Sequence, residues 1–307
     1  MKEFVMRWWL ALVVCLVASV ALAAEEPREL MIGGRTALAT LRLPAQSGPD
    51  VPLVLMTHGT LAHKDMETIQ GLSKALAERG IASLAHNLVL GLDRRTGMYD
   101  CAKPHDYAPD DAIEEIAAWL AEARKTSSRI FVLGHSRGAN QLARYLVANP
   151  KAAIAGAILL APATAGIETS LKAAYAESYG QPLAPLLDKA EAAVSAGRGG
   201  EWMSVPGFIY CRDAKVTARA FAAFYRADRR QDTAALIAGL SVPVLVLAAA
   251  QDKTVPDVAA SFAPLAARAG SRVRLETIDD ADHFFRDLAA EDAADRIAGF
   301  IAAARKE

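Results

Sequence analysis

The sequence predicts an α/β fold in which a mostly parallel sheet carries helices on both faces. Two observations predict it. Short, almost wholly apolar runs of strand length occur at 51–57, 81–87, 129–133, 154–160 and 242–248, as expected for strands that are buried on both faces. Segments with helical periodicity separate most of these runs, and that alternation is typical of parallel strand–helix–strand units.

The helical segments and the outer strands complete the pattern. Helices are predicted at 66–79, 110–125, 139–148, 256–269 and 289–304. Gly80 suits the left-handed position that often ends a helix. Further strands are expected at 38–43, after a turn at Gly33 and Gly34, and at 272–278.

The alternation stops between residues 164 and 239. This segment is rich in alanine, is helical in parts and contains no strong strand signal. We expect an inserted, largely helical cap at 164–239, between a first core part at 24–163 and a second at 240–307. The cap carries several aromatic residues, which either line a binding pocket for an acyl group or form the interior of the cap.

The first 23 residues have the composition of a targeting segment. Lys2 and Arg7 precede an apolar run at 8–20, and Ala21-Leu22-Ala23 fits a cleavage site with small residues. A secretory signal peptide at 1–23 is therefore predicted, and the protein is expected in the periplasm or outside the cell. A membrane anchor is one alternative, although the run is shorter than the roughly 20 residues of a spanning helix. A lipoprotein attached at Cys15 is another, although Leu12-Val13-Val14 before it lacks the small residues that such a site prefers.

Charge and cysteine content narrow the function classes. The net charge is −1, without a basic run or zinc-finger spacing, which argues against nucleic-acid partners. We expect no metal or organic cofactor. Cleavage of the signal would leave Cys101 and Cys211, which an exported protein can join in a disulfide or keep as two unrelated thiols.

The segment 134–138 reads Gly-His-Ser-Arg-Gly and matches the G-x-S-x-G motif. It follows an apolar strand and begins a helix, which is the context in which this motif forms a sharp turn that exposes its serine. Small residues on either side let the backbone pack closely. Ser136 is therefore the candidate nucleophile.

A serine hydroxyl needs an adjacent base to act as a nucleophile. Among six histidines, only His283 lies late in the chain, between the last strand and the last helix. Asp252 follows the strand at 242–248 and is the candidate acid that orients the imidazole. The alternative role for Asp252 is to cap the following helix.

An oxyanion hole needs two backbone N–H groups that point at the developing negative charge. The amide of Arg137, directly after the candidate nucleophile, is expected to supply one. The amide of Thr60, in the His58-Gly59-Thr60 turn after an early strand, is expected to supply the other.

Four motifs together resemble the α/β-hydrolase superfamily, and more closely its esterase, lipase and serine-aminopeptidase-like members. They are HGT at 58–60, GHSRG at 134–138, QDKTVP at 251–256 and DHFF at 282–285. The resemblance extends over roughly 38–304 and implies the α/β-hydrolase fold with a Ser136–His283–Asp252 triad. An HGGG run is absent from the sequence, so the esterases similar to hormone-sensitive lipase fit less well. A serine nucleophile disfavours dehalogenases and dienelactone hydrolases.

The loop at 87–109 and the cap are the expected sources of substrate specificity. Arg94 and Arg95 can bind a carboxylate or phosphate of the substrate, or they belong to a solvated turn. We expect a small ester or amide as substrate, with hydrolysis of a carboxylic ester as the leading function. Peptidase or amidase action, acyl transfer, and a binding protein without activity are the alternatives. Candidate acids for an amine-binding peptidase site are Glu168, Glu177 and Glu201. Oligomeric state stays open.

Overall fold

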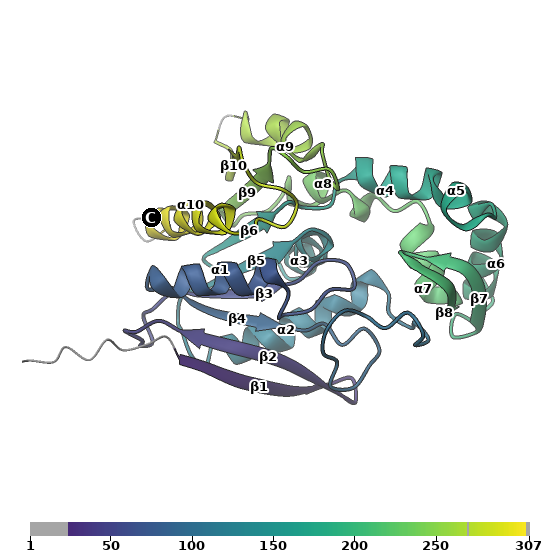
Figure 1. Cartoon of the computed structure of the whole chain (residues 1–307), viewed down its shortest axis with the longest axis horizontal. Helices are drawn as coiled ribbons and strands as arrows, with labels where there is room; N and C mark the ends of the chain where they lie inside the picture. Colours follow the sequence, from purple (N-terminus) through teal and green to yellow (C-terminus); the bar gives the residue numbers. More distant parts are fainter. Residues whose placement is uncertain (1–23, 269, 305–307) are drawn as a thin grey trace, which may run out of the picture.

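The computed structural model describes residues 24–268 and 270–304, so the predicted signal segment at 1–23 lies outside the described residues. An eight-stranded sheet forms the centre of the molecule (Figure 1), with the order β1-β2-β4-β3-β5-β6-β9-β10. Its strands are β1 (Ala24–Ile32), β2 (Arg35–Leu43), β3 (Leu53–Thr57), β4 (Ala82–His86), β5 (Ile130–His135), β6 (Gly156–Leu160), β9 (Val244–Ala249) and β10 (Val273–Ile278).

Six neighbouring strands, from β4 to β10, run parallel, whereas β1 and β2 form an antiparallel hairpin at one edge. Gly33 and Gly34 make the turn of this hairpin with φ of 55° and 75°. The first strand, β1, was not predicted, because it lies at the sheet edge, is largely exposed and contains Pro27, which removes a backbone donor.

The apolar runs form strands buried on both faces. In β3, Leu53 and Leu55 belong to one hydrophobic cluster, whereas Val54 and Met56 belong to the cluster on the opposite side. Successive side chains of a strand point to opposite faces, so a continuous apolar run supplies both clusters at once. The predicted fold class is confirmed.

Helices cover both faces of the sheet (Figure 1). The side chains of α1 (Glu67–Glu78) and α10 (Leu288–Ala303) pack on one face. Those of α2 (Ala112–Ala123), α3 (Arg137–Ala148) and α9 (Val258–Ala266) pack on the other. None of the described helices combines the length and the apolar composition that crossing a membrane requires.

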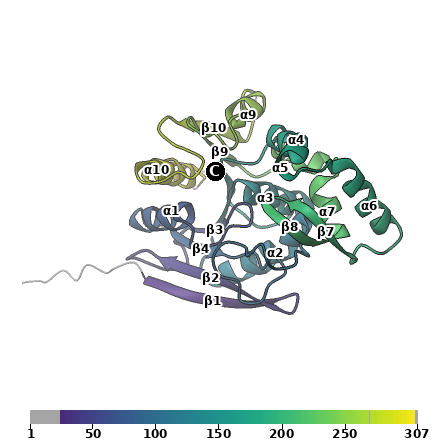
Figure 2. The same ribbon diagram turned by 45° about the vertical axis from the view of Figure 1, so that its right-hand side comes forward.

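The segment between β6 and β9 extends to one side of the sheet (Figure 2). It contains α4 (Ala165–Ala173), α5 (Tyr175–Tyr179), α6 (Leu183–Ser195), β7 (Trp202–Phe208), β8 (Cys211–Thr217), α7 (Ala218–Tyr225), η2 (Arg229–Gln231) and α8 (Thr233–Ile237). The expectation of no strong strand here was wrong, because β7 and β8 pair as an antiparallel hairpin. Pro206 interrupts the alternation of β7, and the hairpin turns directly at Ile209 and Tyr210, which weakened the strand signal.

The loop at 87–109 lies along β8 of the cap. The amide of His105 donates to the carbonyl of Lys215, and the amide of Thr217 donates to the carbonyl of His105. A disulfide joins Cys101 of this loop to Cys211 at the start of β8. Covalent and backbone bonds therefore hold the loop and the cap hairpin together.

A buried carboxylate of α2 is hydrogen-bonded to the loop at 87–109. Glu115 of α2 is buried, and its carboxylate accepts a hydrogen bond from the amide of Val89 at 2.7 Å. Burial raises the pKa of Glu115 to about 7, although that amide and Arg95 both favour the charged form. Burial also lowers the pKa of Arg95 to about 10.

Removal of the disulfide by the double substitution Cys101→Ser and Cys211→Ser should lower the free energy of unfolding by about 2–4 kcal/mol, because the bond closes a long loop in the unfolded chain. Denaturant unfolding with and without reductant measures this. Reductant should bring the wild-type protein to the value of the variant and leave the variant unchanged. Equal stability of oxidised wild type and variant would contradict the prediction.

Replacement of Glu115 by Gln should change how stability depends on pH. The pKa of Glu115 is about 7 in the folded protein against 4.5 for an ordinary glutamate, so the folded state binds more protons between these values. The free energy of unfolding of the wild type should therefore fall by about 3 kcal/mol relative to Glu115→Gln as pH rises through this window. Glu114→Gln, on the exposed side of the same helix, is the control. Parallel pH profiles of wild type and Glu115→Gln would refute this.

Candidate active site

Ser136 lies on a strained turn between β5 and α3, with φ of 54° and ψ of −123°. The glycines of the motif make this turn possible. A methyl group at Gly138 would lie 2.2 Å from the carbonyl oxygen of His58, and one at Gly134 would lie 2.5 Å from the Cα of Ala139. Only glycine fits at either position, and the close backbone packing holds a conformation that a serine adopts rarely.

The structure brings Ser136, His283 and Asp252 together in a continuous hydrogen-bonded relay. His283 Nε2 lies 3.1 Å from Ser136 Oγ, and His283 Nδ1 lies 2.8 Å from Asp252 Oδ2. An ionised carboxylate only accepts, so Nδ1–H donates to Asp252 and Nε2 accepts from the serine hydroxyl. Ser136 is 9% exposed and His283 is 5% exposed, which shields the relay from bulk water.

Asp252 uses its two carboxylate oxygens for different partners. While Oδ2 faces His283, Oδ1 accepts hydrogen bonds from the amides of Thr254 at 2.7 Å and Val255 at 2.8 Å. Burial acts to raise the pKa of Asp252, but the bonds with His283 and with these amides outweigh it and lower that pKa. Asp252 therefore stabilises the turn that follows it and orients the imidazole, whereas the alternative role as cap of the following helix was wrong, because α9 begins at Val258 with Asp257 as its N-cap residue.

His135 is a site residue that the sequence did not single out. Its Nε2–H donates to the backbone carbonyl of His283 at 2.9 Å, and its ring lies 5.0 Å from the His283 ring. Burial lowers the pKa of His135 to about 4, so the ring stays neutral. The side chain fixes the loop that carries His283. No local pattern signals this, because the bond spans 148 positions.

The residues expected to form the oxyanion hole lie next to Ser136. A methyl group at Gly59 would lie 3.2 Å from Ser136 Cβ, so the backbone that carries Thr60 passes close to the candidate nucleophile. Arg137 is the first residue of α3, where a backbone N–H has no acceptor within its own helix. The side chains also meet, because Arg137 Nε donates to Thr60 Oγ1 at 3.2 Å.

His58 supports this turn from the interior. Its Nδ1–H donates to the carbonyl of Gly59 at 2.9 Å, and its Nε2 accepts from the amide of Leu88 at 3.1 Å and from Arg95 at 3.0 Å. Burial is the main cause that lowers the pKa of His58 well below its ordinary value, and the charge of Arg95 adds to it. A neutral His58 therefore connects the 58–60 turn to the loop at 87–109.

Arg94 and Arg95, which the sequence suggested as substrate-binding residues, both bind other groups of the protein in the structure. Arg94 forms an exposed ion pair with Glu29 of β1. Arg95 is buried and donates to the carbonyls of Leu88 and Gly97 besides His58. Arg94 occupies the solvated position that was the alternative, and Arg95 is a structural residue whose guanidinium is already bound within the protein.

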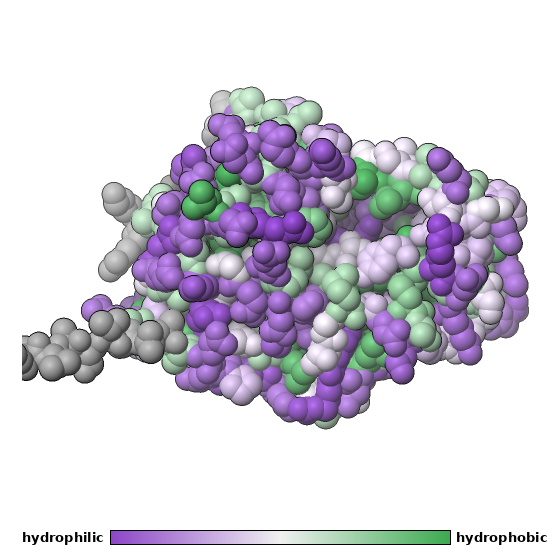
Figure 3. All heavy atoms as spheres, viewed as in Figure 1, coloured by the Kyte–Doolittle hydropathy of each residue, from purple (hydrophilic) through white to green (hydrophobic). Residues whose placement is uncertain are grey.

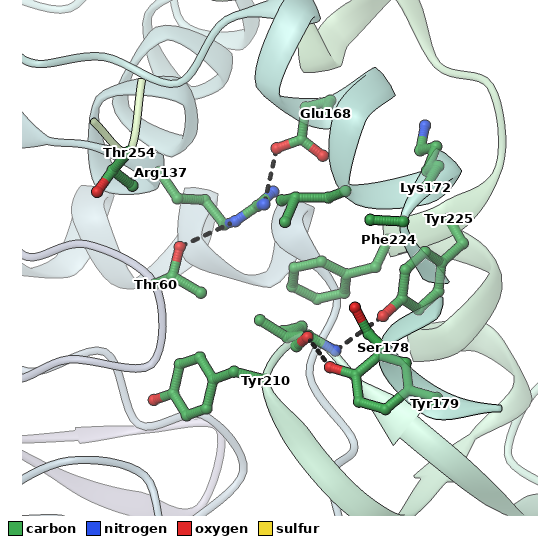
Figure 4. Close-up of a pocket in the computed structure, with 13 residues that line it drawn as sticks. Thr60, Arg137, Glu168, Lys172, Ser178, Tyr179, Tyr210, Phe224, Tyr225 and Thr254 are labelled. Carbon is green, nitrogen blue, oxygen red and sulfur yellow. Dashed lines mark hydrogen bonds and ion pairs between the residues drawn. The ribbon is translucent and has the colours of Figure 1, made fainter. Parts of the chain in front are cut away.

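A pocket of about 250 Å³ lies beside the relay, between core and cap (Figure 4). From the core it is lined by Thr60, Arg137 and Thr254, of which the last two follow Ser136 and Asp252 closely in the chain. Figure 3 shows a hollow between the cap and the rest of the molecule, with apolar side chains at its edge. The cap supplies the rest of the lining: Glu168, Leu171, Lys172, Ala174, Ser178, Tyr179, Ile209, Tyr210, Phe224 and Tyr225.

The cap aromatics fall into two groups, one at the pocket and one in the interior of the cap. Tyr179, Tyr210, Phe224 and Tyr225 line the pocket. Phe208 and Phe221 are instead fully buried and stack with their neighbours in the interior of the cap. Phe208 is close in sequence to Tyr210, and Phe221 is close to Phe224 and Tyr225. Sequence position therefore does not separate the pocket residues from the buried ones, and only the tertiary packing does.

Of the three acids considered for an amine-binding site, only Glu168 lines the pocket. Its Oε1 lies 2.7 Å from Arg137 Nη2, so its charge is already paired (Figure 4). Glu177 is exposed, and Glu201 pairs with Arg198 at the surface. Within the described ranges, no group of three or more His, Cys, Asp or Glu side chains is arranged to hold a metal ion.

Three solved structures of similar fold illustrate the architecture. Est1E from Butyrivibrio proteoclasticus is 17% identical, with a TM-score of 0.61 over 92% of this chain and 99% of that chain. Brefeldin A esterase, a bacterial homologue of human hormone-sensitive lipase, is 18% identical, with a TM-score of 0.61 over 93% of this chain and 78% of that chain. The thioesterase domain from the curacin biosynthetic pathway is 18% identical, with a TM-score of 0.53 over 91% of this chain and 99% of that chain.

These identities establish similarity of fold, and no curated protein sequence matches the chain significantly. The family assignment rests on a different comparison. The model of the alpha/beta hydrolase family matches residues 53–300, which include the elbow at Ser136 and the loops that carry Asp252 and His283. The chain therefore belongs to the alpha/beta hydrolase family, as its four motifs predicted.

Proposed function

We propose that the protein is a serine hydrolase that cleaves a carboxylic ester through an acyl-enzyme on Ser136. The observation that carries the proposal is the buried relay from Ser136 Oγ through His283 to Asp252, with separations of 3.1 and 2.8 Å. An aligned base of this kind activates a serine that is otherwise a weak nucleophile.

The reaction follows from this arrangement. Ser136 Oγ attacks the ester carbonyl while its proton moves to His283 Nε2, and ionised Asp252 stabilises the imidazolium. The amides of Thr60 and Arg137 would bind the oxyanion of the tetrahedral intermediate. His283 then gives its proton to the leaving alkoxide, and a water activated by the same imidazole hydrolyses the acyl-enzyme.

The pocket supports an ester with an apolar or aromatic group as substrate. Most of its lining is aliphatic or aromatic, and such surfaces bind apolar groups by excluding water. The names of two structures of similar fold, brefeldin A esterase and a thioesterase domain, denote cleavage of esters and thioesters by those proteins. This is consistent with the same reaction class here.

Peptidase or amidase action remains the second candidate, and Glu168 in the pocket favours it because a carboxylate can bind a substrate amine. The ion pair with Arg137 weighs against this, since an amine would have to displace a buried guanidinium. Acyl transfer to an alcohol would use the same acyl-enzyme.

We also propose export, with cleavage after Ala23 and a mature protein in the periplasm or outside the cell. The Cys101–Cys211 disulfide supports this proposal, because such bonds persist in oxidising compartments. Sequencing the N-terminus of the protein purified from its producing cell tests it, and a mature chain that retains residues 1–23 would contradict it.

Substitution Ser136→Ala should abolish both covalent labelling by a fluorophosphonate probe and ester hydrolysis, with kcat falling by at least about 10³-fold, because the attacking oxygen is lost. Intact mass measures the adduct, and a panel of esters and aminoacyl amides measures turnover. Ser128→Ala, at an exposed serine, is the matched control. Folded wild type without an adduct or turnover would favour a binding protein, and faster amide than ester cleavage would favour the peptidase.

Substitution Asp252→Asn should lower kcat by about 10³–10⁴-fold at neutral pH, because an amide in place of the carboxylate favours the wrong imidazole tautomer. Steady-state kinetics with the best ester of the panel measures this. Asp280→Asn, which is close to His283 in sequence but exposed, should leave kcat unchanged. A similar loss in both variants would show that charge near the loop matters rather than the relay.

A further inference from the structure

One buried ion pair connects the cap to the residue that follows the proposed nucleophile. Glu168 lies in the first turn of α4, and its Oε1 is 2.7 Å from Arg137 Nη2. The Glu168 and Arg137 side chains are only 7% and 11% exposed. Removing one member of such a pair leaves a buried charge without a partner, so the contact constrains both side chains.

The Arg137 guanidinium also contacts two other segments around the pocket. Its Nε donates to Thr60 Oγ1 at 3.2 Å, and its central carbon lies 5.3 Å from the centre of the Phe224 ring of α7. Figure 4 shows these partners on three sides of the same guanidinium. The Arg137 side chain therefore links the cap to the 58–60 turn.

This link joins the two residues whose amides are expected to form the oxyanion hole. Stabilisation of an oxyanion depends on donors held about 2.7–3.1 Å from its position. The side chain of one donor residue, Arg137, holds the hydroxyl of the other, Thr60, and Glu168 orients that side chain from the cap. A series of contacts, from Glu168 to Arg137 and from Arg137 to Thr60, therefore connects α4 to the expected oxyanion hole.

Lys172, the other cation of the pocket lining, is attracted electrostatically by Glu168, but its hydrogen bonds go to other partners. Its Nζ donates to Gln231 Oε1 at 2.6 Å and to the carbonyl of Arg226 at 3.1 Å. Both bonds remain within the cap. Arg137 is thus the partner that brings Glu168 into contact with the core.

We propose that Glu168 is a positioning residue for the oxyanion hole: through Arg137 it sets the placement of Thr60, so that the hole is fully formed only when α4 is packed against the core. The inference rests on the proposed hydrolase function and adds to it a role for the cap besides contact with substrate. Glu168 acts through Arg137 and does not touch the reacting atoms.

The test compares wild type with Glu168→Gln, Glu168→Asp, Thr60→Val and the double variant Glu168→Gln with Thr60→Val, using one ester. Thr60→Val removes the hydroxyl and keeps the amide. We expect kcat to fall by about 10- to 100-fold in Glu168→Gln and in Thr60→Val, with KM changed by less than about threefold, because misplaced donors weaken binding of the transition state alone. The double variant should lose little more than either single one, and Glu168→Asp should restore part of kcat.

Asp106→Asn is the matched control. Asp106 joins the loop at 87–109 to Arg219 and Thr217 of the cap, so this variant weakens a core–cap ion pair away from the pocket, and its kcat should stay within about twofold of wild type. Thermal melting checks that each variant folds.

Several outcomes would overturn the proposal. They are an unchanged kcat in Glu168→Gln, a change confined to KM, additive losses in the double variant, and an equal loss in Asp106→Asn. If Glu168→Gln fails to fold, the kcat of Thr60→Val becomes the deciding measurement. An unchanged kcat in Thr60→Val overturns the proposal. Wild type that neither hydrolyses esters nor takes up the probe would instead refute the proposed function itself.

Discussion

The close approach of backbone at Gly138 to the carbonyl oxygens of Thr57 and His58 is the constraint on which the site depends. A side chain at Gly138 would overlap both carbonyls, so the start of α3 sits directly against the end of β3. This contact holds Ser136 at positive φ and brings Gly59 against its Cβ. The proposed nucleophile and the turn expected to stabilise its oxyanion are therefore positioned by a single packing contact.

Parallel strands explain how distant residues reach this point. Strands β5, β9 and β10 end at the same edge of the sheet, and Ser136, Asp252 and His283 follow them in that order. Polar groups beyond the relay then fix its members: the amides of Thr254 and Val255 hold Asp252, and His135 holds the backbone of His283. A preorganised relay of this kind needs no rearrangement before proton transfer.

The cap is attached in two ways with different consequences. Its β8 side is joined to the loop at 87–109 by a disulfide, backbone hydrogen bonds and the contacts of Asp106, which makes that side part of the scaffold. Its α4 side reaches the site through Glu168 and Arg137. The pocket thus combines aromatic walls from the cap with a polar end that belongs to the same residues as the expected oxyanion hole.

The sequence alone determined the fold class, the family and the identity of the three relay residues, because buried parallel strands, a glycine-flanked elbow and the order of Ser, Asp and His leave local signals. Only the tertiary structure decided the rest. It placed Arg95 inside the protein, paired Arg94 with Glu29 of β1 and β7 with β8, joined Cys101 to Cys211, and brought His135 and Glu168 to the site. Each of these depends on contacts between residues far apart in the chain or on burial at a surface formed by several elements, and neither leaves a periodic pattern in the sequence.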